Sequence, residues 1–236
     1  MSVKRFVPIV ATALLLLGCG DANQSASQDG SAGSESEGVQ RAGTCSYPPD
    51  GEPAKPVDPP STQDVLNTGE ASATLHMTAG DVAITMDRGA TPCTTNSFLS
   101  LVQQGWLDDT RCHRLTDQGI FVLQCGDPSG TGMGGPGYTV PDELSPLTTG
   151  LEASGAGGVI YPRGTVAMAN TGHPNTGGSQ FFIVWDDSQL PPSYTVFGKV
   201  DDTGLAVVQG IASQGVDAED GTSPIAEALI TSVSLG

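Results

Sequence analysis

Residues 164–185 read GTVAMANTGHPNTGGSQFFIVW and decide the fold. Short apolar runs at 165–169 and 181–184 predict two strands. The Asn, Thr, Gly and Pro residues between them are typical of turns, each for a different physical reason. The stretch therefore predicts two neighbouring strands joined by a long turn.

The same stretch is uncharged. No Asp, Glu, Lys or Arg lies between Arg163 and Asp186, while the neutral amides Asn170 and Gln180 stand near a large aromatic side chain, Phe182. Such a set is poorly suited to acid–base chemistry. It is suited to gripping a neutral, partly apolar group.

The remainder of residues 71–236 continues as short strands and two helices. Apolar alternation predicts a hairpin over 71–86, and Pro92 is a favourable first residue for a helix that ends at Gly105. Further elements are expected as strands at 111–115, 121–125, 194–200 and 228–235 and as a helix around 205–211. About eight short strands with turn signals favour a closed antiparallel barrel, with a sandwich as the alternative.

Composition excludes several classes of protein. The net charge is -17, from nine Lys and Arg against 26 Asp and Glu, so a run of nucleic-acid phosphates could not be neutralised. No CxxC motif or Cys/His cluster indicates a metal, and the glycine-rich run 126–137 lacks the Lys-Ser/Thr ending of a phosphate cradle. We expect no metal, no cofactor and no nucleic-acid partner.

The N-terminus carries an export pattern. Lys4 and Arg5 precede an apolar run, residues 6–17, that is shorter than a membrane span. The run ends before Cys19 in a pattern that resembles a bacterial lipobox, which implies a signal peptide at 1–18, lipidation of Cys19 and a membrane anchor outside the cytoplasm. The alternative is an ordinary signal peptide with a stray cysteine.

Residues 19–70 are predicted to form a disordered tether. Residues 21–43 are rich in Ser, Ala, Gly, Gln and acids, and residues 47–60 contain six prolines. Cys45 suggests that the end of this tether is pinned to the domain at 71–236.

Arg114 is the remaining candidate for chemistry. No G-x-S-x-G motif is present, and paired acids such as Asp108-Asp109 are typical of solvated turns. Arg114 lies inside a strand-like run, where a charge is costly unless it is used, although a surface salt bridge would also explain it.

The order of motifs around Arg114 resembles the cyclophilin family of peptidyl-prolyl isomerases over roughly residues 72–235. The resemblance rests on HRL (113–115), FVLQCGD (121–127), GTG (130–132), MAN (168–170), NTGGSQFF (175–182) and VFGKV (196–200). It implies an eight-stranded antiparallel closed β-barrel capped by two α-helices. It also implies catalysis of X-Pro bond rotation, without metal or cofactor, in exported proline-containing polypeptides.

Carried over by position, the resemblance implies catalytic roles for Arg114, Phe121, Gln124 and Asn170. It implies that substrate is bound by Val122, Met168, Ala169, Gln180, Phe182, Leu190 and Tyr194. The chain departs from the family in having two extra residues between Arg114 and Phe121 and an inserted His173. Gln189 stands where the resemblance implies a tryptophan that helps bind cyclosporin in many eukaryotic members of the family, so we expect weak cyclosporin binding.

Two other functions stay open. A cyclophilin-like module could bind proline segments as a chaperone with little or no catalysis, or it could have a purely structural role in the cell envelope. No feature of the sequence suggests an oligomer, and we expect a monomer.

Apart from Cys19, four cysteines remain in this exported chain, and they allow three disulfide pairings. Cys112 and Cys125 stand near the far ends of two strands joined by one turn, which predicts a bond between them and leaves Cys45 to pair with Cys93. Free buried thiols are the alternative.

Overall fold

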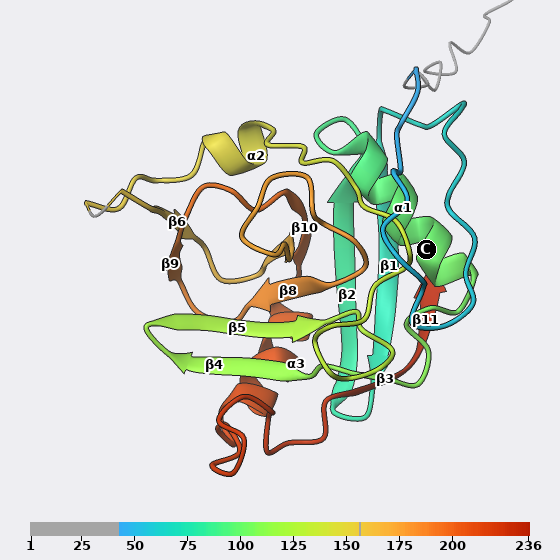
Figure 1. The fold of residues 1–236 in the computed structure, drawn as a ribbon. Coiled ribbons are helices and arrows are strands. Elements are labelled where there is room, and N and C mark those ends of the chain that lie inside the picture. Colours follow the sequence, from blue (N-terminus) through green and yellow to red (C-terminus); the bar gives the residue numbers. More distant parts are fainter. Residues whose placement is uncertain (1–42, 156) are drawn as a thin grey trace, which may run out of the picture. The chain divides into compact units, whose positions relative to one another are not determined.

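The structure is a computed structural model that describes residues 43–155 and 157–236 (Figure 1). Within these residues, one antiparallel sheet contains nine strands in the order β3-β11-β1-β2-β10-β7-β8-β5-β4. Its strands are β1 (Glu70–Met77), β2 (Gly80–Asp87), β3 (Thr110–Arg111), β4 (Arg114–Gln118), β5 (Ile120–Cys125), β7 (Thr165–Met168), β8 (Phe181–Val184), β10 (Val196–Val200) and β11 (Leu229–Leu235).

The sheet curls until its two outer strands, β3 and β4, are joined by only two residues, Cys112 and His113. Cys112 N–H donates to the Ala228 carbonyl at 2.8 Å, and His113 N–H donates to the Gln124 carbonyl at 3.0 Å. One bent segment therefore serves both edges. The predicted antiparallel, barrel-like fold is confirmed, although the described sheet has nine strands where eight were expected and curls as a half-barrel.

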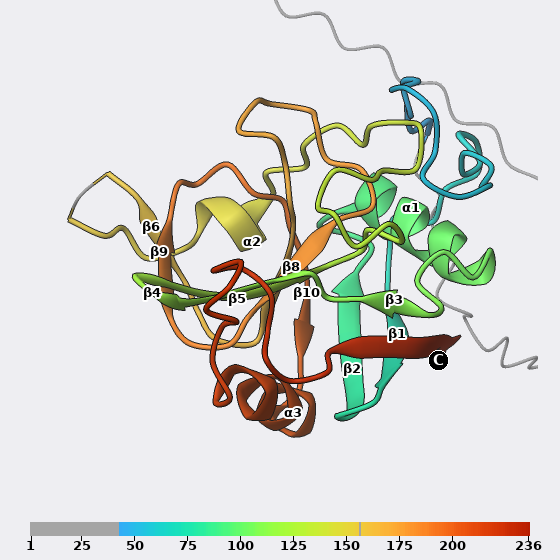
Figure 2. The same ribbon diagram turned by 60° about the horizontal axis from the view of Figure 1, so that its bottom comes forward.

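The helices α1 (Pro92–Gln103) and α3 (Asp202–Ala212) match the two that were predicted. Figures 1 and 2 show them at opposite ends of the curled sheet. A third helix within the described residues, α2 (Pro146–Thr149), was missed because a single turn is too short to show a helical period.

Helix α1 begins without a side-chain cap from Thr91. The Glu143 carboxylate supplies the cap from a distant loop, accepting from Cys93 N–H at 3.0 Å and Thr94 N–H at 2.7 Å. A carboxylate at a helix N-terminus satisfies free amide donors and complements the helix dipole. This contact fixes α1 to the loop that leads towards α2.

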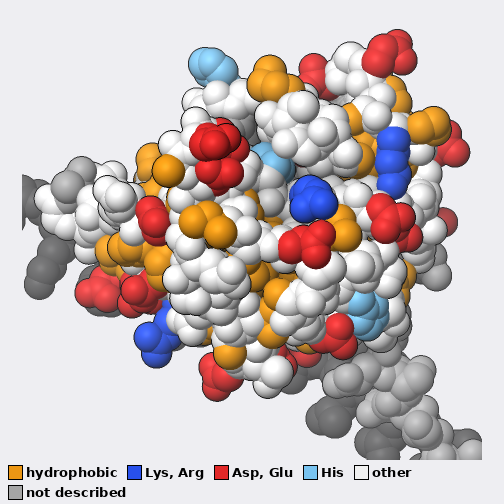
Figure 3. Space-filling view, turned by 90° about the horizontal axis from the view of Figure 1, so that it is seen from below, with side chains coloured by type: hydrophobic (Ala, Val, Ile, Leu, Met, Phe, Trp, Pro, Cys, Tyr) orange, Lys and Arg blue, Asp and Glu red, His pale blue; other side chains and the backbone are white. Residues whose placement is uncertain are grey.

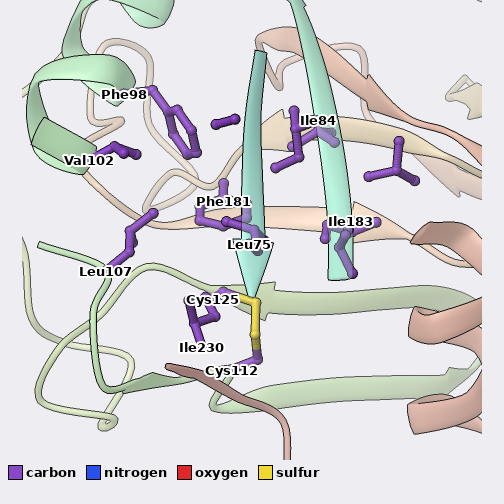
Figure 4. Close-up of a cluster of buried hydrophobic side chains, with 14 of the residues drawn as sticks. Leu75, Ile84, Phe98, Val102, Leu107, Cys112, Cys125, Phe181, Ile183 and Ile230 are labelled. Carbon is purple, nitrogen blue, oxygen red and sulfur yellow. A yellow bond between two sulfur atoms is a disulfide. The ribbon is translucent and has the colours of Figure 1, made fainter. Parts of the chain in front are cut away.

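The inner face of the sheet and the two helices share one hydrophobic core. The Phe98 ring of α1 packs edge-on against Phe181 of β8, with ring centroids 5.5 Å apart. Figure 4 shows the Cys112–Cys125 disulfide at the border of this core, near Leu75 and Ile230. The predicted pairings Cys112–Cys125 and Cys45–Cys93 are both present.

Residues 43–69, which we call the strap, are not a disordered tether as predicted. Cys45, Tyr47 and Val65 are 5%, 8% and 3% exposed and belong to the core. The strap runs beside α1 in Figures 1 and 2, and the Tyr47 hydroxyl donates to the Cys93 carbonyl at 2.9 Å. The folded domain therefore begins before residue 71. The sequence did not show this because the isolated apolar residues of the strap form no periodic pattern.

The predicted signal peptide, Cys19 and the tether up to residue 42 lie outside the described residues. Among the residues that are described, no helix has the length and apolar character needed to cross a bilayer. Figure 3 shows one face of the molecule with acidic side chains scattered among neutral ones and basic side chains standing singly. This agrees with the acidic composition.

Candidate active site

Four neighbouring strands place the candidate residues in one row. Arg114 of β4 stands opposite Gln124 of β5, Gln124 opposite Phe182 of β8, and Phe182 opposite Ala167 of β7. Residues directly opposite one another project to the same face of a sheet. The next residue along each strand faces the inner core instead: Leu115, Leu123, Ile183 and Val166.

Arg114 is held by a chain of side-chain amides, which we call the amide relay. Its Nη1 donates to Gln124 Oε1 at 3.3 Å, and Gln124 Nε2 donates to Gln180 Oε1 at 2.8 Å. Gln180 Nε2 in turn donates to the carbonyls of Gly132 and Gly134 at 2.9 and 3.0 Å. Because backbone carbonyls only accept hydrogen bonds, they fix which end of the Gln180 amide is the NH2 group. Gln180 in turn fixes the Gln124 amide, whose oxygen then accepts from Arg114.

The glycine-rich loop that supplies those carbonyls is built around Asp127, which is fully buried. One carboxylate oxygen accepts from Ser129 N–H and Oγ at 2.7 Å, and the other accepts from the N–H groups of Gly132 and Gly134 at 2.7 and 3.0 Å. Burial alone would raise the pKa of Asp127, but the hydrogen bonds from Ser129, Gly134 and Gly132 outweigh it and lower the pKa. The hydrogen bonds of the loop therefore stabilise the ionised form of this carboxylate.

The loop needs glycine where it meets this carboxylate. A Cβ added at Gly134 would collide with Asp127 Oδ1, so no larger residue fits without moving the loop. The same glycine offers its carbonyl to Gln180. Asp127 thus positions the start of the amide relay.

His113, the residue before Arg114, adds no charge to the site. Burial lowers its pKa, and the nearby Asp127 carboxylate opposes that shift only in part. The imidazole is neutral at pH 7, which leaves Arg114 as the cation of this row.

An apolar cluster continues the row beyond the amides. It packs Val122, Phe182, Val184 and Leu190 together with Tyr161 of β6 (Val159–Tyr161), which pairs with β9 (Ser188–Leu190). The Tyr194 ring stands at 88° to the Phe182 ring with centroids 5.3 Å apart. Phe182 faces this cluster and Phe181 faces the inner core, because adjacent residues of a strand project to opposite sides.

The side chains of two predicted site residues, Phe121 and Met168, do not pack in this apolar cluster. The Phe121 ring packs against Trp185 with centroids 4.9 Å apart, while Ile120 and Val122 contact the apolar cluster. Met168 is 6% exposed and lies in the inner core, whereas Ala169 packs against the apolar cluster. Both differences follow from alternation, since adjacent residues of a strand face opposite sides.

Asn170 lies at the site, but its side chain is engaged. Its Nδ2 donates to the Ser193 carbonyl at 2.9 Å, and its Oδ1 accepts from Gly172 N–H at 3.0 Å. It therefore organises the loop after β7, and each amide atom keeps capacity for one further hydrogen bond.

Sequence reasoning missed two contributors, Ile120 and Asp127. Ile120 packs against the apolar cluster, and a single apolar residue beside a turn gives no signal that would distinguish it. Asp127 carried a signal, since Asp followed by Ser, Thr and Gly is typical of a side chain that caps its own turn.

The arrangement combines one fixed guanidinium, neutral amides and an apolar cluster. Among the described residues, no group of three or more His, Cys, Asp or Glu side chains could hold a metal ion. A peptide with an apolar ring can pack against the apolar cluster and accept a hydrogen bond from Arg114.

Comparisons with known proteins agree with this geometry. The family profile described as cyclophilin type peptidyl-prolyl cis-trans isomerase/CLD matches residues 72–235. The chain is 44% identical over 200 residues to the probable peptidyl-prolyl cis-trans isomerase B of Mycobacterium leprae and 46% identical over 197 residues to that of Mycobacterium tuberculosis. Each alignment covers 81% of this chain but 66% and 63% of the relatives, so the chain spans about two thirds of their length.

Among solved structures, the fold is similar to a cyclophilin type peptidyl-prolyl cis-trans isomerase of Cryptosporidium parvum. The TM-score is 0.59 at 29% identity, over 71% of this chain and 98% of the other. A structure of the same protein in the presence of the dipeptide Ala-Pro gives a TM-score of 0.57. The sequence match, the fold and the geometry around Arg114 agree, and the chain belongs to the cyclophilin-type peptidyl-prolyl cis-trans isomerase family.

Proposed function

We propose that this protein is a peptidyl-prolyl cis-trans isomerase that accelerates X-Pro bond rotation in exported polypeptides. The observation that carries the proposal is the row in which the amide relay fixes Arg114 beside the apolar cluster of Phe182. The apolar cluster can pack against a proline ring, and the fixed guanidinium can donate a hydrogen bond to the amide that precedes this ring.

The reaction has to overcome the barrier of about 18–20 kcal/mol that amide resonance sets. No covalent bond is broken, so the site needs no nucleophile. When the amide twists, the lone pair localises on the prolyl nitrogen and becomes a better acceptor. Arg114 donates to that nitrogen more strongly in the twisted state than in the planar one, which is the condition for catalysis.

We further propose that the protein acts at the outer face of the cell membrane as a lipid-anchored monomer. The support is the export pattern of residues 1–18 with Cys19, together with two disulfides, which suit an oxidising compartment. Replacing Cys19 with Ser should move the protein from the membrane fraction to the soluble fraction. A Cys19→Ser variant that stays with the membrane would contradict the lipid anchor.

An assay on a proline tetrapeptide tests the activity. Catalytic amounts of the folded protein should raise the exchange rate between cis and trans isomers, measured by NMR exchange or by a protease-coupled assay. If the protein binds the peptide but leaves that rate at the uncatalysed value, the chaperone-like binding module becomes the better account.

A further inference from the structure

A cavity of about 430 Å³ adjoins the amide relay. The glycine-rich loop, the loop after β7 and the strap form its walls. Its lining includes Gln124, Gln180, Asn170, Met133, Tyr138 and Asp50. The strap therefore contributes to the surroundings of Arg114, although it precedes the part of the chain that matches the family.

Backbone hydrogen bonds hold the strap against the glycine-rich loop. Asp50 N–H donates to the Gly137 carbonyl at 2.8 Å, and Thr139 N–H donates to the Pro48 carbonyl at 2.9 Å. Ala54 N–H donates to the Gly135 carbonyl at 2.9 Å. With the Cys45–Cys93 disulfide behind it, the backbone of Asp50 has a fixed place at the cavity.

Asp50 supplies the charge of this cavity. It is the one charged side chain among the described residues that line it, and its carboxylate makes no ion pair or hydrogen bond with any other described residue. The remaining lining is neutral and partly apolar, and the Met133 side chain is 89% exposed. A long apolar stem with a cationic end fits such a lining, whereas an acidic side chain is repelled.

We propose that Asp50 selects proline-containing segments that carry a lysine or arginine within a few residues of the proline. The basic stem lies along Met133 and the neutral wall, and its charge meets the Asp50 carboxylate. This inference rests on the proposed function, because it concerns which segments the same site accepts.

The test is a series of peptides with one proline, in which a single Lys is moved from the first to the third residue on either side. Gln at the same place is the neutral reference. The values of kcat/KM are measured for the full chain, for Asp50→Asn and for Asp58→Asn. Asp58 is the matched control, because it is an exposed acidic residue of the same strap. Its backbone forms hydrogen bonds with the Gln104 side chain, outside the cavity.

At one position the wild type should prefer Lys over Gln by about two- to five-fold, as expected for an exposed ion pair, and the preference should weaken at high salt. Asp50→Asn should abolish it and leave turnover of the Gln peptide unchanged, whereas Asp58→Asn should preserve it. Absence of any Lys preference in the wild type, or its survival in Asp50→Asn, would overturn the proposal.

Failure of the proposed function would look different. If no peptide is turned over, the isomerase assignment fails, and the dissociation constants of the same peptides still decide the role of Asp50. If the wild type binds the Lys peptide more tightly than the Gln peptide and Asp50→Asn does not, the result supports the role of Asp50. Equal dissociation constants for the Lys and Gln peptides in the wild type contradict it.

Discussion

Arg114 on β4 stands directly opposite Gln124 on β5, and its Nη1 donates to Gln124 Oε1 at 3.3 Å. The sheet register thus places the one cation of the row within reach of a side-chain acceptor. Gln180 and the glycine carbonyls continue the same chain of hydrogen bonds. The guanidinium is therefore oriented before substrate arrives.

The amide relay should act as one unit. Gln124→Ala and Gln180→Ala should each lower kcat on a proline tetrapeptide by about tenfold, because either change releases Arg114, an effect of about 1.4 kcal/mol. The double variant should lose little more than a single one, since residues in one network are not additive. Gln118→Ala, at the exposed end of β4, is the control. A double variant whose loss equals the product of the single losses would mean that the two amides act independently.

The buried Asp127 carboxylate should make stability fall in acid. Its folded pKa lies below the ordinary value of 3.8, so its stabilisation is complete above that value and is lost as pH falls through the lower, folded pKa. Asp127→Asn should cost about 1–3 kcal/mol at pH 7, because an amide leaves one buried donor set unpaired, and it should flatten the acid limb. Urea titrations between pH 7 and pH 2 measure both effects. The exposed Asp117→Asn variant should retain the wild-type profile; identical acid limbs for wild type and Asp127→Asn would refute the role of the carboxylate.

Both disulfides should stabilise the fold, but only Cys112–Cys125 should also affect turnover. Loop lengths of 13 and 48 residues predict losses of about 3 and 4 kcal/mol when Cys112–Cys125 and Cys45–Cys93 are replaced by Ala pairs. Guanidinium unfolding measures these losses. Removal of Cys112–Cys125 should also reduce turnover, because this disulfide ties together the chain segments that carry Arg114 and Gln124. Equal turnover in both double variants would argue against that second effect.

Cyclosporin should bind weakly, because the position at which many relatives carry a tryptophan is an exposed glutamine, Gln189 of β9. Gln189→Trp should tighten binding about tenfold, as a buried aromatic contact commonly does. Calorimetric titration compares it with the wild type and with Gln118→Trp, which should behave as the wild type. Tight binding by the unmodified chain would contradict the expectation.

Most strands of the large sheet and the two longer helices could be predicted from sequence because their apolar residues repeat with a clear period, whereas the three-residue strands β6 and β9 are too short to show one and were missed. Residues 164–185 show this well, since their two apolar runs form β7 and β8, in which the adjacent rings of Phe181 and Phe182 project to opposite faces. The disulfides followed from the closeness of two strand ends. These features depend on local pattern, which a single sequence contains.

Other features depend on packing that no local pattern reveals. The strap is held by scattered residues such as Cys45, Tyr47 and Val65, none of which stands in a periodic run. The neighbours that Phe121 and Met168 pack against, Trp185 and the inner core, depend on tertiary packing and could not be read from position along the chain. Asp127 acquires its role only when the glycine-rich loop closes around it.

The most direct test is turnover of a proline tetrapeptide by Arg114→Ala beside Arg111→Ala. Arg111, three residues earlier, is exposed and contacts Glu227 at 3.4 Å, so it controls for loss of an arginine from the same segment. Arg114→Ala should lower kcat/KM by about 10²–10³-fold with an unchanged melting temperature, as expected when a preorganised donor is removed, while Arg111→Ala should retain full turnover. Full turnover by a folded Arg114→Ala variant would contradict the central claim.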